Sequence, residues 1–163
     1  MRYILLAVTA VLLSGCTQII SEQSLRLVDP ELSFEELHRA PERYNGRHLM
    51  LGGTIVTVRN RSSGAELELA QLKTDGDGNI VDTTSSGGRF LAVSSSLLDP
   101  AIYLPGLRVT LVGEVSGKKI MTLDEADYTY PIILINEIHL WTPEEIPSPP
   151  SFQFGIGVGT IFH

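Results

Sequence analysis

The feature that most constrains the fold is a series of apolar segments with a period of two, all between residues 49 and 141. In the clearest segment, Leu107, Val109 and Leu111 alternate with polar residues. A β-strand with one buried face and one wet face produces this alternation, because successive side chains point to opposite faces. The sequence therefore predicts a mainly β fold of five strands, the other four lying at 49–59, 65–69, 90–93 and 132–141.

The segments between these strands indicate how the strands connect. Residues 60–64 have the composition of a hairpin loop, residues 74–88 that of a long polar loop, and Gly52-Gly53 suggests a bulge or sharp coil within the first strand. Five strands with an excursion between the third and the fourth suggest a small closed or partly closed Greek-key barrel of the OB type. A plain β-sandwich is the alternative.

A short helix is expected before the first strand. Ser33 is followed three residues later by Glu36, the pattern of a capping box, and the helix should end at Pro41 or soon after it. Four of the nine prolines lie within residues 142–151 and end the domain. We therefore place the OB-like domain at 33–142 and a Pro-rich linker with a C-terminal tail at 143–163.

The first 15 residues have the pattern of a secretory signal peptide. Arg2 precedes an apolar stretch from Ile4 to Leu13, and a transmembrane helix would need about 20 apolar residues. The single cysteine follows directly in Leu13-Ser14-Gly15-Cys16, a motif that resembles the lipobox of bacterial lipoproteins. The alternative is an unmodified thiol after an ordinary signal peptide.

The lipobox resemblance implies a modified N-terminus. In that family the cysteine, here Cys16, receives a diacylglyceryl group, the signal is cleaved before it, and the new amino terminus is acylated with a fatty acid such as palmitate. Thr17 in place of Asp implies export to the outer membrane in enteric-type bacteria. Several acyl chains hold a protein at a membrane essentially permanently. Residues 16–32, which show no helical or strand period from position 17 onward, are expected to form the acylated cysteine and a tether.

Charge and cysteine content exclude several classes of function. The net charge of −7 argues against nucleic acid as a partner, because a phosphate backbone requires clustered Lys and Arg. One cysteine excludes an intramolecular disulfide and a zinc cage built from cysteines.

Short fragments of the domain form a further pattern, which consists of Pro41-Glu42-Arg43-Tyr44-Asn45-Gly46, Leu51-Gly52-Gly53, Leu67-Glu68-Leu69-Ala70, Gly88-Arg89-Phe90, Leu98-Asp99-Pro100, Val112-Gly113, Tyr130-Pro131 and His139-Leu140-Trp141. In order and spacing these fragments resemble the Slp family of starvation-inducible outer-membrane lipoproteins. The resemblance covers the signal and residues 33–142. It implies a lipid-anchored protein linked to stress and stationary-phase survival, with no enzymatic activity.

The residues that could support catalysis or bind a metal are scattered. The four histidines (His38, His48, His139 and His163) lack the spacing of metal ligands, and the sequence contains no nucleophile elbow, phosphate loop or dinucleotide fingerprint. The run from Asp75 begins like an EF-hand loop, but Ile80 stands where that loop needs Gly and Ser86 where it needs Glu. We expect a solvated turn there, no catalytic residues, no metal and no cofactor beyond the covalent lipid.

Four basic residues are candidate ligand contacts. In an OB-like barrel the loop after strand one would carry Arg59 and Arg61, and the loop after strand four would carry Lys118 and Lys119. These two loops border the usual ligand face, where they could meet anionic sugars or lipid headgroups. The alternative is that they are solvated charges at hairpin tips.

The tail shows a second strand-like pattern. Even positions carry most of its large apolar residues (Phe152, Phe154, Ile156, Val158 and Phe162), while three odd positions are glycines. This resembles the last strand of outer-membrane β-barrels. We expect the tail to dock on a partner, on another copy or on the sheet edge of its own domain. The alternative is a disordered or surface-adsorbed tail.

These observations lead to one expectation of function. The chain should be an outer-membrane lipoprotein, anchored by lipid and facing the periplasm, with a non-enzymatic structural or interaction role in the stressed bacterial envelope. Its partners would be the membrane and an envelope protein or a second copy. The alternative is a binding domain for an anionic envelope ligand, either a glycan or a lipid headgroup.

Overall fold

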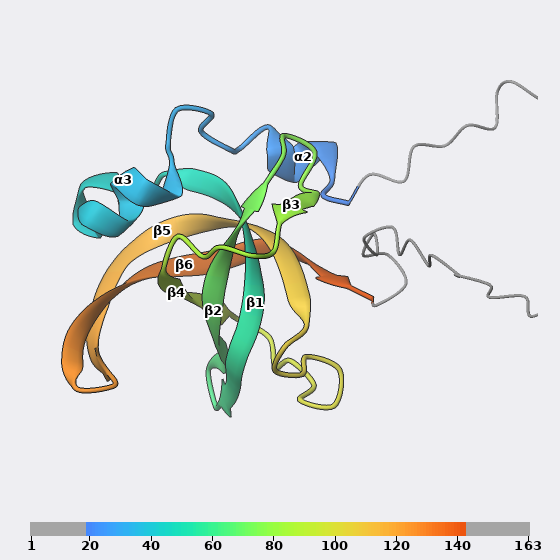
Figure 1. Ribbon diagram of the computed structural model, residues 1–163. Coiled ribbons are helices and arrows are strands. Elements are labelled where there is room, and N and C mark those ends of the chain that lie inside the picture. The colour runs from blue at the N-terminus through green and yellow to red at the C-terminus, as the bar shows by residue number, and fades with distance from the viewer. Residues whose placement is uncertain (1–18, 143–163) are drawn as a thin grey trace, which may run out of the picture.

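Strand β1 lies in two ladders at once, and this closes the sheet into a barrel. In the computed structural model, which describes residues 19–142, β1 pairs antiparallel with β2 on one side and with β5 on the other. The elements are α2 (Glu22–Leu25), α3 (Phe34–Arg39), η1 (Pro41–Tyr44), β1 (His48–Arg61), β2 (Gly64–Thr74), β3 (Ile80–Asp82), β4 (Arg89–Ser94), β5 (Arg108–Leu123) and β6 (Ala126–Trp141). Figure 1 shows the strands wrapped around one another below α2 and α3.

The ring of strands has the expected Greek-key order. It runs β1–β2–β4–β6–β5 and returns to β1, and the pairing of β4 with β6 is its one parallel ladder among the described residues. This is the connectivity of a five-stranded barrel of the OB type, so the predicted fold class is confirmed. The β-sandwich alternative is wrong, because two separate sheets would not share β1. The additional strand β3 was not predicted and pairs only with β2.

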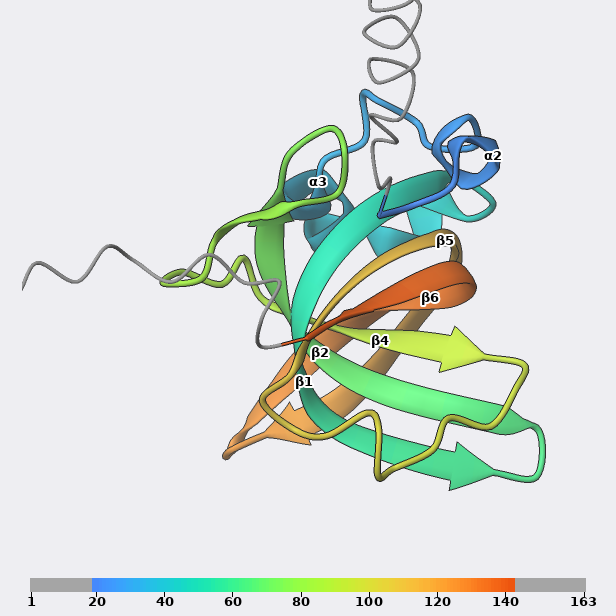
Figure 2. The same ribbon diagram turned by 90° about the vertical axis from the view of Figure 1, so that its right-hand side faces the viewer.

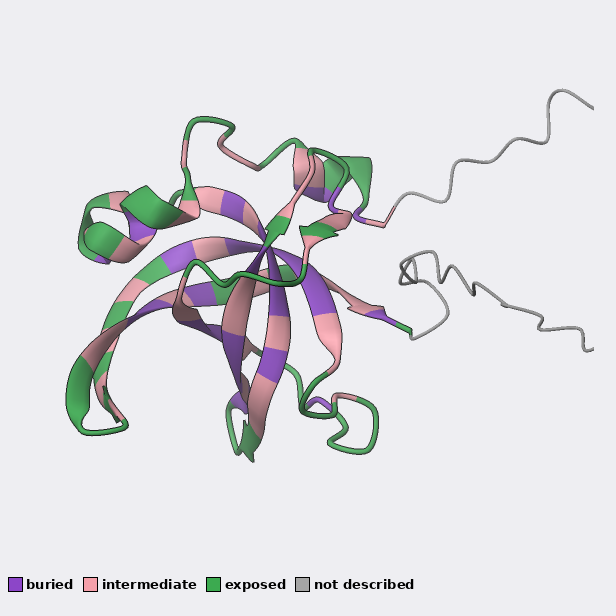
Figure 3. Ribbon diagram, in the orientation of Figure 1, coloured by how far each residue is buried: buried purple, intermediate pink, exposed green. Residues whose placement is uncertain are grey.

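The barrel is filled by the side chains that the alternation placed inward. Leu67 and Leu69 of β2 are fully buried, as are Phe90 of β4 and Val109 and Leu111 of β5. Leu37 of α3 joins the same cluster, so the helix packs against the barrel interior. Figure 3 shows the buried positions along the strands, while the far end of the β5–β6 hairpin is mostly exposed.

The helix before the barrel begins as its sequence predicts. Ser33 caps α3 by accepting a hydrogen bond from the Glu36 N–H, and the Glu36 carboxylate in turn accepts from the Ser33 N–H. The Ser33 hydroxyl and then its N–H lower the pKa of Glu36 below the ordinary value. The helix ends at Arg39, and Pro41 begins the short 3-10 helix η1.

The described part of the expected tether, residues 19–32, is not a free spacer. Ile20 is 0% exposed, and residues 22–25 form α2. The N–H and hydroxyl of Ser21 both donate to the carboxylate of Glu137 on β6. Partial burial would raise the pKa of Glu137, but the hydrogen bonds from Ser21 and Ser24 outweigh it and lower that pKa. The tether prediction is therefore wrong for these residues, because the buried side chain of Ile20 and the hydrogen bonds of Ser21 to Glu137 fix them to the barrel.

Strand positions differ from expectation in β1 and β5. The irregularity of β1 lies between Ile55 and Thr57 rather than at Gly52-Gly53. A Cβ on Gly53 would lie 3.2 Å from the Ala70 carbonyl oxygen, so this glycine allows β1 and β2 to approach each other closely. Strand β5 passes through a register shift between Val115 and Lys118 and continues to Leu123. A bulge absorbs the turn-like residues there without ending the strand.

One predicted wet position is buried. Thr110 is the polar residue between Val109 and Leu111, so the alternation places it on the wet face, yet it is 0% exposed. Its hydroxyl donates to the Gly78 carbonyl at 2.8 Å and accepts from Trp141 Nε1 at 3.0 Å. The loop before β3 therefore covers this side of the barrel.

Candidate functional site

The candidate site is the outer face of β2 where the β5–β6 hairpin reaches it. Leu67 and Leu69 of β2 point into the core, so Glu66 and Glu68 point outward. In five-stranded barrels of this type, the outer face of the second and third strands and the loops beside it hold ligands. The corresponding strands here are β2 and β4, and the bordering connections are the β1–β2 turn and the β5–β6 hairpin.

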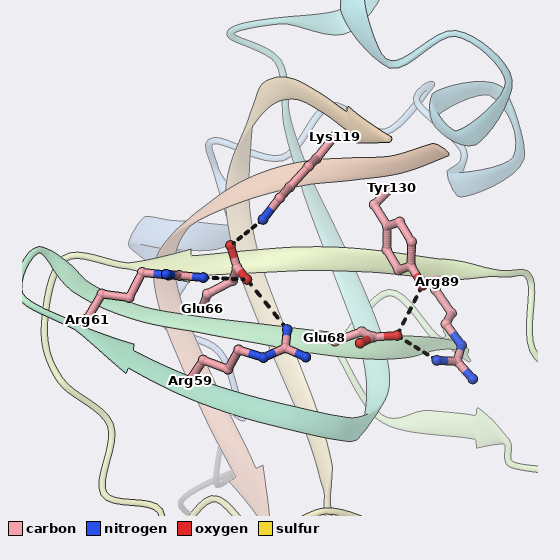
Figure 4. Close-up of polar contacts among 7 residues, drawn as sticks. All are labelled: Arg59, Arg61, Glu66, Glu68, Arg89, Lys119 and Tyr130. Carbon is pink, nitrogen blue, oxygen red and sulfur yellow. Dashed lines mark hydrogen bonds and ion pairs between the residues drawn. The ribbon is translucent and has the colours of Figure 1, made fainter. Parts of the chain in front are cut away.

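Three cations surround the Glu66 carboxylate (Figure 4). Lys119 Nζ donates to Glu66 Oε2 at 3.2 Å. Two guanidiniums lie near the other oxygen, Oε1, with Arg59 Nη1 at 3.7 Å and Arg61 Nη2 at 3.9 Å. Glu66 Oε1 is buried and accepts no hydrogen bond, because both guanidiniums stand too far from it. We call Arg59, Arg61, Lys119 and Glu66 the cation cluster.

Strand register explains how the cation cluster forms. Arg59 lies directly opposite Glu66 in the β1–β2 ladder, and Arg61 is two residues further on the same face. Lys119 arrives from β5, which does not neighbour β2 in the barrel. Three positive charges against one negative charge leave the cluster with a formal charge of +2, although the whole chain carries −7.

A second, more buried network lies next to the cation cluster. Glu68 is 8% exposed, and its Oε1 accepts hydrogen bonds from Arg89 Nη1 at 2.5 Å and from the Tyr130 hydroxyl at 3.2 Å. The hydrogen bond to Glu68 raises the pKa of the Arg89 guanidinium. Burial, and then the charge of Glu68, raises the pKa of the Tyr130 phenol. The network therefore holds Arg89 charged and Tyr130 protonated at neutral pH.

The network continues to the helix before the barrel. The Tyr128 hydroxyl accepts the Arg89 backbone N–H at 2.8 Å, and His38 Nε2 of α3 lies 2.8 Å from the same hydroxyl. The Tyr128 and Tyr130 rings meet edge to face at 4.9 Å. These contacts fix the hairpin to α3, β2 and β4, and so fix the position of Lys119.

The structure brings together three of the four predicted ligand contacts. Arg59, Arg61 and Lys119 meet at Glu66, whereas Lys118 pairs with Glu42 of η1 at 2.8 Å. The expectation that these residues lie in loops is wrong, because β1 extends to Arg61 and β5 includes both lysines. Lys118 instead lines a separate hollow of about 310 Å³ between η1 and the hairpin.

Other site residues were not identified from the sequence. In the strand expected at 65–69, Leu67 and Leu69 alternate with Glu66 and Glu68, which places both glutamates on one outward face. No sequence signal indicated that Arg89 and Tyr130 would meet Glu68, because they belong to strands 21 and 62 residues away.

Two groups of predicted residues lie outside residues 19–142: the lipidation site Cys16 and the docking residues of the tail, which are Phe152, Phe154, Ile156, Val158 and Phe162. Within the described residues, no group of three or more His, Cys, Asp or Glu side chains could hold a metal ion. In that same part of the chain, no helix is long and apolar enough to cross a membrane.

Comparison with known proteins gives a family match over most of the chain. The sequence pattern of the outer membrane lipoprotein Slp family matches residues 13–156. The uncharacterized lipoprotein YeaY of Escherichia coli (strain K12) is 26% identical over 148 residues, which cover 90% of this chain and 76% of that protein. An uncharacterized protein of Haemophilus influenzae is 23% identical over 111 residues, or 68% of this chain and 60% of that protein.

Single-stranded DNA-binding proteins are among the solved structures with some similarity. The small protein of Streptomyces coelicolor is 14% identical with a TM-score of 0.36, and the match covers 61% of this chain and 98% of that chain. The mitochondrial protein Rim1 of S. cerevisiae is 12% identical with a TM-score of 0.35, covering 59% of this chain and 95% of that chain. At these values the similarity carries no inference about what this chain binds.

Proposed function

The chain belongs to the outer membrane lipoprotein Slp family, and from this premise we propose that it is a non-catalytic binding module whose cation cluster recognises an anionic group of the envelope. The members of this family are outer-membrane lipoproteins. In this proposal the covalent lipid on Cys16 fixes the domain to the membrane, and the domain faces the periplasm.

One observation carries the binding proposal. Arg59, Arg61 and Lys119 share a single carboxylate, so the outer face of an acidic domain carries a local excess of two positive charges. A phosphate or a carboxylate placed beside Glu66 would balance that excess. Guanidinium groups suit such ligands because their planar donors match the oxygens of an anion in pairs.

The two arginines have donors available for a ligand. Their side chains are 49% and 59% exposed, and their contacts with Glu66 are longer than hydrogen bonds. Exposed ion pairs of this kind contribute about 0–1 kcal/mol, so turning Arg59 or Arg61 toward an anion costs little. Lys119 is held more firmly, by its hydrogen bond and by the buried contacts of the neighbouring Tyr130.

A binding role fits the arrangement better than a catalytic one. Both carboxylates of the face are engaged by cations, and the described residues there include no nucleophile beside a general base. The buried Glu68 network sets the positions of strands and side chains and offers no exposed reacting group. The face can therefore hold a charged group without transforming it.

Titration with small anions tests this function. Glycerol phosphate represents a lipid headgroup, and galacturonate represents an acidic glycan. We expect the side-chain NMR signals of Arg59 and Arg61 to shift with either anion, while those of Arg26 and Arg39, which are more exposed and lie outside the cation cluster, stay unchanged. Equal shifts at all four arginines would show general charge screening and would contradict the proposal.

The membrane and stress parts of the proposal have separate tests. Cys16→Ser should move the protein from the outer-membrane fraction to the soluble periplasmic fraction, because the acyl anchor is lost. The link to starvation is supported by the family resemblance, and we expect the protein to accumulate as cells enter stationary phase. Constant abundance through growth would contradict that link without affecting the binding proposal.

A further inference from the structure

The loop between β4 and β5, residues 95–107, exposes apolar side chains with almost no charge. Leu97 is 66% exposed, Ile102 54% and Leu104 47%. Asp99 is the one charged residue of the loop, and it accepts the Ala101 N–H within its own turn. We call Leu97, Ile102 and Leu104 the apolar loop patch.

The loop is firmly attached to the barrel, so its exposed side chains are presented by a fixed backbone. The side chain of Asn60 accepts the Leu98 N–H at 3.1 Å and donates to the Leu98 carbonyl at 2.7 Å. Ile55 donates to the Leu107 carbonyl and accepts from the Gly106 N–H, both at 2.8 Å. Leu98, which Asn60 holds, is itself buried at 9% exposure. Neighbouring residues thus point inward while the apolar loop patch points outward.

The length of chain before the domain limits how far the domain can stand from a lipid on Cys16. Ile20 is fully buried, and Ser21 is bonded to Glu137. Four residue steps separate Cys16 from Ile20, which span at most roughly 14 Å even when fully extended. The bilayer must therefore lie close to the side of the domain where Ile20 enters.

The loop that carries the apolar loop patch lies on that same side in Figure 1, although α2 is near the top of that side and the loop is near its bottom. In Figure 1, α2, the loop between β4 and β5 and the end of β6 all lie toward the right, while the tip of the β5–β6 hairpin lies toward the left. Figure 2, seen from the right, shows α2 and this loop turned toward the reader. A flat surface along the whole of this side would therefore meet both the attachment point and the loop.

We infer that the apolar loop patch contacts the lipid bilayer beside the acyl anchor and so fixes how the domain stands on the membrane. The inference rests on the proposed lipid anchor at Cys16. The net charge of the chain is negative and does not draw the domain as a whole to an anionic surface, whereas uncharged leucine and isoleucine side chains are favoured at the boundary between headgroups and acyl chains. In this account the acyl anchor keeps the domain near the bilayer, and the apolar loop patch sets the orientation of the domain on it.

Fluorescence quenching in vesicles tests the contact. The acylated protein is reconstituted in vesicles of phosphatidylethanolamine and phosphatidylglycerol, as the variant Ile102→Cys carrying an environment-sensitive fluorophore. Acylation occupies the thiol of Cys16, so the introduced thiol is the one that reacts. The matched control is Ile120→Cys, because Ile120 is a 60% exposed isoleucine on the hairpin at the other side of the domain.

We expect the label at position 102 to emit at shorter wavelength and to lose emission to a quencher carried in the lipid. The label at position 120 should lose emission to aqueous iodide instead. A label at 102 that iodide quenches as it quenches the control would overturn the inference.

Shielding of position 102 from both quenchers would also overturn it, since the loop would then be covered by protein. Repeating the measurement on a chain stopped at Pro150 would show whether that protein is the tail. Failure of the anchor itself appears separately, because the protein would then not float with the vesicles.

Discussion

Lys119 Nζ lies 3.2 Å from Glu66 Oε2, although the two residues are 53 positions apart and their strands are not neighbours in the barrel. Lys119 pairs directly with Tyr130 across the β5–β6 hairpin, and Tyr130 reaches Glu68, two residues beyond Glu66. One cross-strand pair of the hairpin thus meets one pair of carboxylates on β2. This contact brings Lys119 to the two arginines of β1 and creates the cation cluster.

Removing the Tyr130 hydroxyl tests whether the hairpin is held by the buried network. We expect Tyr130→Phe to lower the free energy of unfolding by about 1 kcal/mol, because Glu68 loses one hydrogen bond. Urea denaturation measures the change. Tyr103→Phe is the control, since its ring packs against the core and its hydroxyl has no hydrogen-bond partner among residues 19–142. Equal losses in both variants would show that the Glu68 contact contributes nothing.

The same phenol predicts a loss of stability in alkali. The pKa of Tyr130 is raised in the folded state, above its ordinary value near 10. The contribution is fully present below about pH 10 and is lost as the pH rises through the folded-state pKa, because the unfolded chain releases this proton first. Unfolding followed from pH 9 to 11 should therefore show a steeper decline for the natural protein than for Tyr130→Phe. Parallel curves would contradict this assignment.

The N-terminal segment is expected to stabilise the domain. Ile20→Ala should cost about 2–5 kcal/mol, because it empties a fully buried site. Leu27→Ala, in the same segment but 49% exposed, should change the free energy of unfolding by less than about 0.5 kcal/mol. Similar small effects of both substitutions in urea denaturation would mean that residues 19–32 act as a free tether.

We expect that only glycine fits without strain at position 113, where the β5–β6 ladder shifts register. A Cβ at this position would lie 2.5 Å from the Leu134 carbonyl oxygen and 2.5 Å from Ile133 Cγ2. Gly113→Ala should therefore cost about 1–3 kcal/mol through overpacking. Gly76→Ala has no atom within 4 Å of its Cβ and should stay within about 0.5 kcal/mol of the natural protein. Thermal unfolding measures the stability of the two variants, and equal midpoints would contradict the prediction.

Local chemistry made much of the barrel predictable. The Ser33 and Glu36 pair identified the helix start, and the alternation of Leu67 and Leu69 with Glu66 and Glu68 gave both faces of β2. These patterns depend on residues a few positions apart, which a sequence displays directly.

The sequence-based predictions were wrong where contacts between distant segments determine burial or strand length. Thr110 is buried because the Gly78 loop covers it, and Ile20 is buried because the barrel offers it a site; neither partner is near in sequence. Lys118 and Lys119 follow a glycine and precede an acidic stretch, which is typical of a turn, yet their strand continues through a bulge because β6 pairs along its whole length. The four candidate cations were found by their charge, whereas the carboxylate that gathers three of them depends on tertiary structure.

The most direct test of the cation cluster is calorimetric titration of the protein with glycerol phosphate, comparing two variants of equal charge. One variant replaces Arg59, Arg61 and Lys119 with Gln; the other replaces Arg26, Arg39 and Lys73, which are exposed cations outside the cluster. We expect the first variant to raise the Kd by about tenfold or more, since each charged hydrogen bond contributes on the order of 1.5–3 kcal/mol, and the second to bind as the natural protein does. Equal weakening in both variants, or no binding by the natural protein to glycerol phosphate or to galacturonate, would contradict the account.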